Sequence, residues 1–135
     1  MHTSRGFVKR VLSVSTIAPM YSSTFIFATK QFDDTFHRLD EAIATAARSI
    51  DGYLGEESWE DSARGLVSNV YYWKSLEALQ ALMQHPTHLE AKAAQAQWLN
   101  GYQVVIAQVL RTYGDDKLAG LLPTAGLFAQ GATQH

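Results

Sequence analysis

The spacing of hydrophobic residues changes several times along the chain, and each change marks an expected element of secondary structure. Residues 22–32 are rich in β-branched and aromatic side chains and contain neither Gly nor Pro, which predicts a strand. Apolar residues then recur at intervals of three and four from Phe36 to Ile50. This period predicts a helix with one apolar face, which begins beside the acidic Asp33 and ends before Gly52.

Two further strands are expected on either side of a short turn. Residues 53–60 predict a strand that Gly55 interrupts, and residues 66–74 predict the next strand. The sequence EDSARG between them supplies the turn. Ser75 is a suitable N-cap for a helix over the following LEALQALMQ, whose leucines and methionine form an apolar stripe.

A second helix and a last strand complete the pattern after the break that Pro86 makes. Thr87 and Glu90 have the spacing of a capping box, which predicts a helix that runs to about Leu99. Residues 102–113 predict the last strand. The order β-α-β-β-α-β is that of the ferredoxin-like split-βαβ arrangement, so we expect an α+β fold.

The last strand is apolar on both of its faces. Val104, Ile106 and Leu110 point to one face, and Val105, Ala107 and Val109 point to the other. One layer of helices covers only one face of a sheet, so we expect the sheet of a second subunit on the other face. The chain is thus predicted to form a homodimer, a dimeric α+β barrel. In the alternative, residues 114–135 fold back over the strand with the apolar side chains of Leu118, Leu121, Leu122, Leu127 and Phe128.

The composition limits the classes of protein to which the chain can belong. Its 135 residues are 47% hydrophobic and 18% charged, which is typical of one small globular domain. No apolar run approaches the ~20 residues that span a bilayer. The absence of cysteine excludes disulfides, thiolate metal sites and cysteine nucleophiles. A net charge of −2 is not the basic charge that is typical of proteins that bind nucleic acid. We expect a cytoplasmic protein that binds neither nucleic acid nor membranes.

Charge sets the first 20 residues apart from the rest of the chain. Residues 1–20 contain three basic residues and no acidic residue. Such a segment is typical of a basic N-terminal extension, or alternatively of an organellar transit peptide. We expect residues 21–114 to form the domain and residues 115–135 to form a tail that packs on the partner subunit.

Several short motifs in the second half of the chain carry a resemblance to a known family. They are a strand that ends in Tyr-Trp-Lys-Ser, a Leu-Glu-Ala-Leu helix, a His-Pro-x-His break and a closing strand that finishes in Tyr113-Gly114. With the helix that ends in Asp51-Gly52-Tyr53, they resemble the antibiotic biosynthesis monooxygenase family over about residues 22–114. The resemblance implies a dimer with a pocket between the sheet and the helices of each subunit. Some members oxygenate phenolic compounds with dioxygen alone, whereas others degrade haem or have no known activity.

The cofactor-free oxygenases of this family rely on an Asn and a Trp four residues apart on the third strand. Asn69 and Trp73 stand at that spacing, and Tyr71 between them shares their face of the strand. The amide of Asn69 can hydrogen-bond a phenolic oxygen or a developing oxyanion, and Trp73 offers a stacking wall. The resemblance therefore implies Asn69 and Trp73 as catalytic residues and no cofactor. It also implies a substrate-binding pocket that includes Tyr71, Phe27, Leu79 and Met83. In the alternative, Trp73 is a core aromatic and Asn69 satisfies a local backbone group.

The chain also departs from both branches of the family. The positions of a further Tyr and Arg in the oxygenases hold Leu79 and Ala93, so half of that polar set is absent. The positions of the residues that degrade haem in the other branch hold Thr29, Leu82 and Lys92. The resemblance thus implies a monooxygenase for an aromatic, phenolic or quinol-like molecule and dioxygen. The alternatives are a non-catalytic binding or stress-response module and a haem-binding protein.

The internal histidines are the remaining candidates for chemistry. His85 and His88 are three residues apart, a spacing that can place two ligands on one helical face, but Pro86 lies between them. We expect His85 to cap a helix, His88 to lie at the surface and His37 to lie on the polar face of the first helix. Haem binding without degradation would use His85 or His88.

Overall fold

The computed structural model describes residues 18–29, 33–118 and 120–121. Within these residues the chain forms four strands and three α-helices, with one short 3-10 helix before the last strand. In chain order they are β1 (Met20–Thr29), α2 (Asp34–Ser49), β2 (Tyr53–Asp61), β3 (Leu66–Trp73), α3 (Leu76–Met83), α4 (Pro86–Ala94), η1 (Gln95–Gln97) and β4 (Leu99–Val109). The order of elements predicted from the sequence is confirmed.

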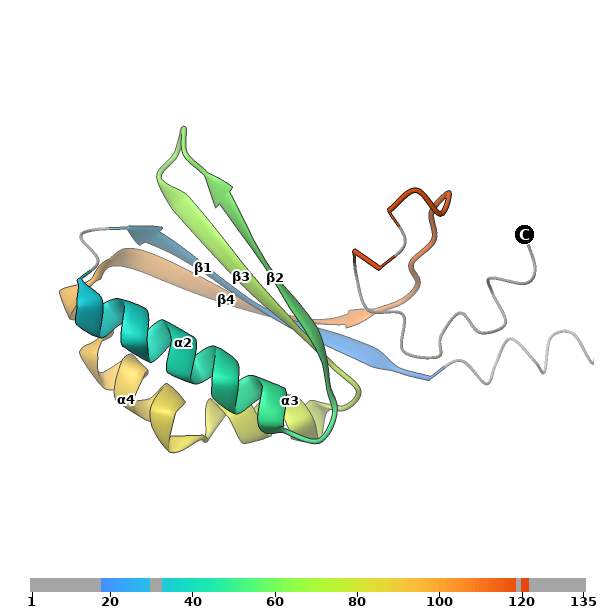
Figure 1. The fold of residues 1–135 in the computed structure, drawn as a ribbon, viewed down its shortest axis with the longest axis horizontal. Helices are drawn as coiled ribbons and strands as arrows, with labels where there is room; N and C mark the ends of the chain where they lie inside the picture. The colour runs from blue at the N-terminus through green and yellow to red at the C-terminus, as the bar shows by residue number, and fades with distance from the viewer. Residues whose placement is uncertain (1–17, 30–32, 119, 122–135) are drawn as a thin grey trace, which may run out of the picture.

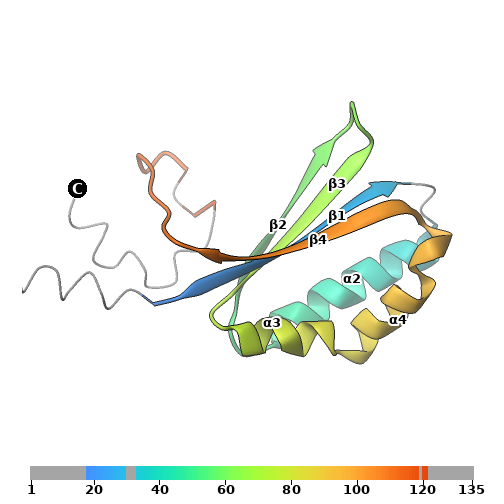
Figure 2. The ribbon, with the colours of Figure 1, turned by 180° about the vertical axis from the view of Figure 1, so that it is seen from behind.

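The four strands form one antiparallel sheet in the order β2-β3-β1-β4. Figures 1 and 2 show all three helices on the same side of this sheet, so the domain has two layers. Phe25 of β1 pairs with Asn69 of β3 and with Val104 of β4, and all three residues face the helices. The predicted α+β, ferredoxin-like class is confirmed.

The first helix is placed by its cap and by small residues on its buried face. The Asp33 carboxylate accepts a hydrogen bond from the backbone N–H of Phe36 at 2.9 Å and so caps the first turn of α2. Near the other end, Ala46 and Ala47 are buried in one cluster with the fully buried Trp73. Small side chains at these positions let the helix lie close to the sheet.

The start of α4 corrects the prediction of a capping box at Thr87 and Glu90. The cap is His85, whose Nδ1 accepts a hydrogen bond from the backbone N–H of Thr87 at 3.1 Å. Pro86 is the first helical residue, where its missing N–H costs nothing and its fixed φ suits a helix. The prediction that His85 caps a helix is confirmed, and both the cap and the first helical residue lie two positions earlier than the capping box predicts.

The end of α4 and the start of β4 also differ from the prediction. The helix ends at Ala94, and β4 begins at Leu99 rather than at residue 102. Gly101 lies inside β4 with a φ of +121°, in the range that glycine tolerates best. The register between β1 and β4 shifts at this end of the pair, which accommodates that conformation.

β4 is a sheet edge that the rest of the described chain leaves uncovered. Val104 and Val105 are each 41% exposed, and Ile106 is 50% exposed, although they alternate between the two faces. Leu118 and Leu121 are exposed as well and do not cover the strand. The other apolar residues expected to fold back, Leu122, Leu127 and Phe128, lie outside the described residues. In the described part of the chain, no helix has the length and apolar character needed to cross a membrane.

Candidate functional site

A cavity of about 210 Å³ lies between the sheet and the helices. It is larger than the cavity of about 150 Å³ that has been engineered to bind benzene in another protein. Its walls come from every part of the fold except β2, and most of its surface is apolar. A cavity of this kind is suited to a small organic molecule with a ring system.

Aromatic side chains form one continuous wall of this cavity, which we call the aromatic wall. The ring of Phe25 lies 5.1 Å from Phe27 and 5.6 Å from Tyr102, measured between centroids. Phe36 of α2 lies 6.3 Å from Phe27 and 5.7 Å from Trp98, which follows the 3-10 helix. Rings at these distances support one another and offer flat apolar surface to an aromatic ligand.

Two polar side chains of β3 project into the cavity from the sheet. The hydroxyl of Ser58, on β2, donates a hydrogen bond of 2.7 Å to Oδ1 of Asn69. The amide nitrogen of Asn69 is therefore left as the donor for a ligand. Burial, assisted by the negative charges of Glu56 and Asp40, raises the pKa of the Tyr71 hydroxyl, so it stays protonated and can donate as well.

The helices bring three titratable side chains to the opposite wall. Asp40 of α2 lies at the rim, where desolvation and the charges of Glu41 and Glu56 raise the pKa of its carboxyl group. His88 and Lys92 come from α4. Burial, followed by the positive charge of Lys92, lowers the pKa of the His88 imidazole, which is therefore neutral at pH 7.

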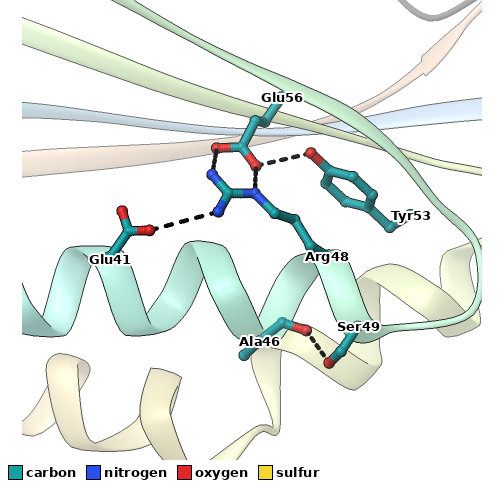
Figure 3. A network of polar contacts seen from close by, with 6 residues as sticks. All are labelled: Glu41, Ala46, Arg48, Ser49, Tyr53 and Glu56. Carbon is teal, nitrogen blue, oxygen red and sulfur yellow. Dashed lines mark hydrogen bonds and ion pairs between the residues drawn. The ribbon is translucent and has the colours of Figure 1, made fainter.

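An ion-pair network at the end of α2 fixes the helix against β2 (Figure 3). Nε and Nη2 of Arg48 donate to the two carboxylate oxygens of Glu56 at 2.8 and 3.1 Å. The Tyr53 hydroxyl donates to the same carboxylate at 2.8 Å. Since Glu56 also acts on the pKa values of Asp40 and Tyr71, this network is electrostatically linked to the cavity.

Some residues predicted from the sequence come together in the cavity, and others do not. Asn69, Tyr71, Phe27 and Met83 all line it. Leu79 is buried in the cluster between the sheet and α3 and does not line the cavity.

Trp73 lies in that same cluster and is fully buried. Its indole N–H donates a hydrogen bond of 3.0 Å to the hydroxyl of Ser23, which does line the cavity. The indole is thus placed behind the cavity, and it contacts the lining through Ser23 and through the ring of Tyr71, 6.1 Å away. This position agrees with the alternative in which Trp73 is a core aromatic.

The prediction that His88 is a surface residue is wrong. Its side chain is partly buried in the cavity wall because α4 turns this position toward the sheet. The sequence patterns did not predict that Asp40 and most of the aromatic wall line the cavity. The residues of the wall that were not predicted are Phe25, Phe36, Trp98 and Tyr102. Asp40 does have a sequence signal, since it lies beside Leu39 and Ile43 at the border of the apolar face of its helix. His37 is exposed, as expected.

No three His, Cys, Asp or Glu side chains gather as a set of metal ligands within the described ranges of the chain.

The residues of the cavity offer hydrogen-bond donors, one neutral imidazole, one carboxyl group and a lysine beside flat apolar surface. Chemically, this arrangement can hold a flat hydroxylated ring and influence its ionisation.

Comparison with known proteins supports the fold. No family model matches the sequence. An uncharacterised protein of Bacillus subtilis, YqjZ, is 29% identical over 102 residues, which cover 74% of this chain and 88% of that protein.

Three solved structures share the fold. SnoaB, a cofactor-independent oxygenase from Streptomyces nogalater, aligns with a TM-score of 0.61 and 12% identity over 73% of this chain and 100% of its own. Rv0793 of Mycobacterium tuberculosis aligns with a TM-score of 0.61 and 18% identity over 70% and 99% of the two chains. A Nitrosomonas europaea protein described as an antibiotic biosynthesis monooxygenase aligns with a TM-score of 0.59 and 14% identity over 70% and 94%. At these identities the structures establish a common fold.

Proposed function

Because the chain has the fold of the antibiotic biosynthesis monooxygenases, we propose that it is a cofactor-independent monooxygenase for a flat aromatic, phenolic or quinol-like substrate. The observation that carries the proposal is the cavity itself. It combines the aromatic wall with free donors on β3, in a fold that a known cofactor-independent oxygenase also has.

The proposed reaction needs only the substrate and dioxygen. An ionised, electron-rich ring transfers one electron to dioxygen, and the two radicals combine to form a carbon–oxygen bond. Loss of water from the resulting hydroperoxide leaves a carbonyl group. One oxygen atom ends in the product and the other in water, and the substrate supplies all four electrons. The protein's part is to hold the ring flat and to favour its ionised form.

Asn69 is the residue that we place at the centre of this chemistry. Its carbonyl oxygen accepts a hydrogen bond from Ser58, so its amide N–H groups remain as donors for the phenolic oxygen of a bound substrate. A donor directed at developing negative charge stabilises the transition state more in an apolar cavity than in water. Tyr71 adds a second donor from the same face of β3.

We also propose that the protein acts as a homodimer whose subunits pack through the sheet face opposite the helices. Thr24 pairs with Val70 and Val105 across β1, β3 and β4, which places these three side chains together on that face. Ile26 lies on the same face two residues along β1. Sedimentation at micromolar concentration is expected to give twice the chain mass of 15.0 kDa. A species of one chain mass would contradict the dimer.

Oxygen uptake tests the proposed activity directly. Purified protein, free of metal, flavin and haem, is expected to consume dioxygen with at least one member of a panel of anthrones, naphthols and hydroquinones. Asn69→Ala is expected to lower kcat/KM at least tenfold, which corresponds to about 1.4 kcal/mol of transition-state stabilisation. Gln80→Ala, at an exposed position of α3 outside the cavity lining, is the control and should keep the activity.

Two other outcomes would replace the proposal. Binding of these compounds without oxygen uptake would identify a non-catalytic binding module. Haem binding would appear as a shift of the Soret band that is lost in the His85→Ala, His88→Ala double variant. In that case His88 would be the ligand to test singly, since Nδ1 of His85 already accepts the hydrogen bond from Thr87 that caps α4.

A further inference from the structure

The polar groups of the cavity are divided between its two walls. The sheet contributes neutral donors, the amide of Asn69 and the hydroxyl of Tyr71. The helices contribute Asp40, His88 and Lys92. A hydroxylated ring between the walls would therefore have hydrogen-bond donors on the sheet side and, on the helix side, the proton acceptors Asp40 and His88 beside the cation Lys92.

His88 is the side chain on the helix side whose hydrogen bonding is incomplete. Its Nδ1 is buried and has no hydrogen-bond partner among the described residues. Buried polar atoms in folded proteins are nearly always paired, and this unpaired nitrogen belongs to a side chain that lines the cavity, where a ligand can supply the missing partner. The most direct partner for a neutral imidazole nitrogen is a hydroxyl donor.

Burial, together with one neighbouring positive charge, keeps this imidazole neutral. Five titratable residues line the cavity: Asp40 from α2, Tyr71 from β3, Tyr102 from β4, and His88 and Lys92 from α4. Desolvation is the largest influence on His88 and lowers its pKa, and the Lys92 ammonium group acts in the same direction. The Met83 backbone carbonyl opposes them, and the net effect remains a lowering. The imidazole is therefore available as an acceptor at neutral pH.

We propose that His88 is the base that accepts the hydroxyl proton of the substrate, with the ring of the substrate held against the aromatic wall. This inference rests on the proposed oxygenase function. The O–H bond breaks, its electron pair stays on the substrate oxygen, and the proton moves to an imidazole nitrogen. The proton leaves with the water that forms when the carbonyl product is made, which restores the neutral base.

The other groups on the helix side are less suited to this step. Lys92 acts on His88 as a positive charge, and this charge favours the phenolate that forms. Asp40 is exposed at the rim and lies beside the negative charges of Glu41 and Glu56. A phenolate formed next to Asp40 would meet like charges, whereas one formed next to His88 gains a cationic partner.

Kinetics with substitutions at the two neighbouring histidines test the proposal. His88→Gln keeps a polar side chain of similar size but removes the base, and general bases contribute at least about 100-fold. We expect kcat for oxygen uptake to fall at least about 100-fold while KM stays within about threefold. His85→Asn is the matched control, because asparagine is an equally good N-cap, and should leave both parameters unchanged.

The pH dependence separates loss of the base from damage to the structure. Wild-type uptake should decline as the pH drops through the lowered pKa of His88, because the protonated ring cannot accept a second proton. For His88→Gln, the deficit should shrink once the pH exceeds the pKa of the substrate, since the ionised substrate needs no base. A deficit of constant size at every pH, or uptake within about threefold of wild type, would overturn the proposal.

An anaerobic experiment with 4-nitrophenol separates this proposal from the oxygenase function. Only the ionised form of this probe absorbs visible light, so its spectrum reports the ionisation of the bound phenol without any oxygen chemistry. We expect wild-type protein at pH 6 to hold at least about three times more ionised probe than His88→Gln, and His88→Asn to behave like His88→Gln. Ionised probe without oxygen uptake would support the base and refute the oxygenase. Equal ionisation in wild type and both variants, or no binding to wild type, would refute the base.

Discussion

Single side chains in the cavity owe their chemical roles to partners on other elements. Asn69 is a donor toward the cavity because Ser58 of β2 occupies its carbonyl oxygen. Trp73 is held behind the cavity because Ser23 of β1 accepts its indole N–H. Tyr71 stays a donor because burial raises its pKa. None of these roles is a property of the residue alone.

Trp73→Phe distinguishes a core role from a catalytic role. The change removes the hydrogen bond to Ser23 and leaves a gap in a fully buried site. We therefore expect the free energy of unfolding to fall by about 1–3 kcal/mol. Denaturant titration measures this loss. Since the ring is not part of the cavity lining, kcat for oxygen uptake should change less than threefold. A tenfold fall in kcat for the folded variant would instead assign Trp73 a catalytic role.

Asp40→Asn is expected to make stability less dependent on pH. The pKa of Asp40 is raised above its ordinary value of 3.8, so the folded state holds this proton more tightly than the unfolded state. The ionised carboxylate therefore costs stability above the folded-state pKa, and the cost disappears below pH 3.8. We expect a modestly higher Tm for the variant at pH 7 and no difference near pH 3. A lower Tm at pH 7 would contradict the raised pKa.

At the scale of elements, short connections decide how the helices meet the sheet. Gly52 joins α2 to β2 with a φ of +105°, and its backbone carbonyl accepts a hydrogen bond of 2.8 Å from the N–H of Lys74. It also lies directly against α3, since a Cβ atom at this position would stand 2.8 Å from Cβ of Ala78. The connection thus brings three elements together at one residue.

Gly52→Ala should be markedly destabilising because it adds backbone strain and a clash. A left-handed conformation costs a side-chain-bearing residue about 1–2 kcal/mol, and overpacking typically adds about 1–3 kcal/mol. Gly65, with a φ of +66° and no atom within 4 Å of a Cβ position, supplies the control. Gly65→Ala should cost only the backbone strain, about 1–2 kcal/mol. Equal losses of unfolding free energy in the two variants would show that Ala78 shifts far enough to accommodate the added methyl group without cost.

At the scale of the whole molecule, the sheet has helices on one face only. The open face and the exposed edge strand β4 present apolar side chains that a monomer would leave in water. The expectation of a partner subunit came from the apolar residues on both faces of this strand. Its exposure on both faces supports that prediction, whereas the described part of the tail does not cover it.

Val105→Glu tests the open face as a subunit interface. A buried and unpaired carboxylate is costly, so we expect the variant to sediment as a species of 15.0 kDa. Gln80→Glu adds the same charge on an exposed position of α3 and should leave the mass unchanged. A wild-type dimer that tolerates Val105→Glu would place the interface elsewhere.

Local patterns were sufficient to predict most elements and one wall of the cavity. A strand repeats every two residues, so Asn69 and Tyr71 could be assigned to one face before their surroundings were known. The error in the start of α4 arises because two local signals compete. At the start of α4, His85 and Pro86 outweighed the capping box at Thr87, because the proline suits the first helical position.

The order of elements, the α+β class and the apolar character of both faces of β4 could all be predicted from the amino-acid sequence. These follow from periodicity and from turn-forming residues, which act over a few residues of chain. The positions of Trp73 behind the cavity and of His88 in its wall became visible in the folded chain alone. They could not be predicted because a side chain's burial and pKa depend on which other elements pack against it. That information is spread over residues far apart in the chain.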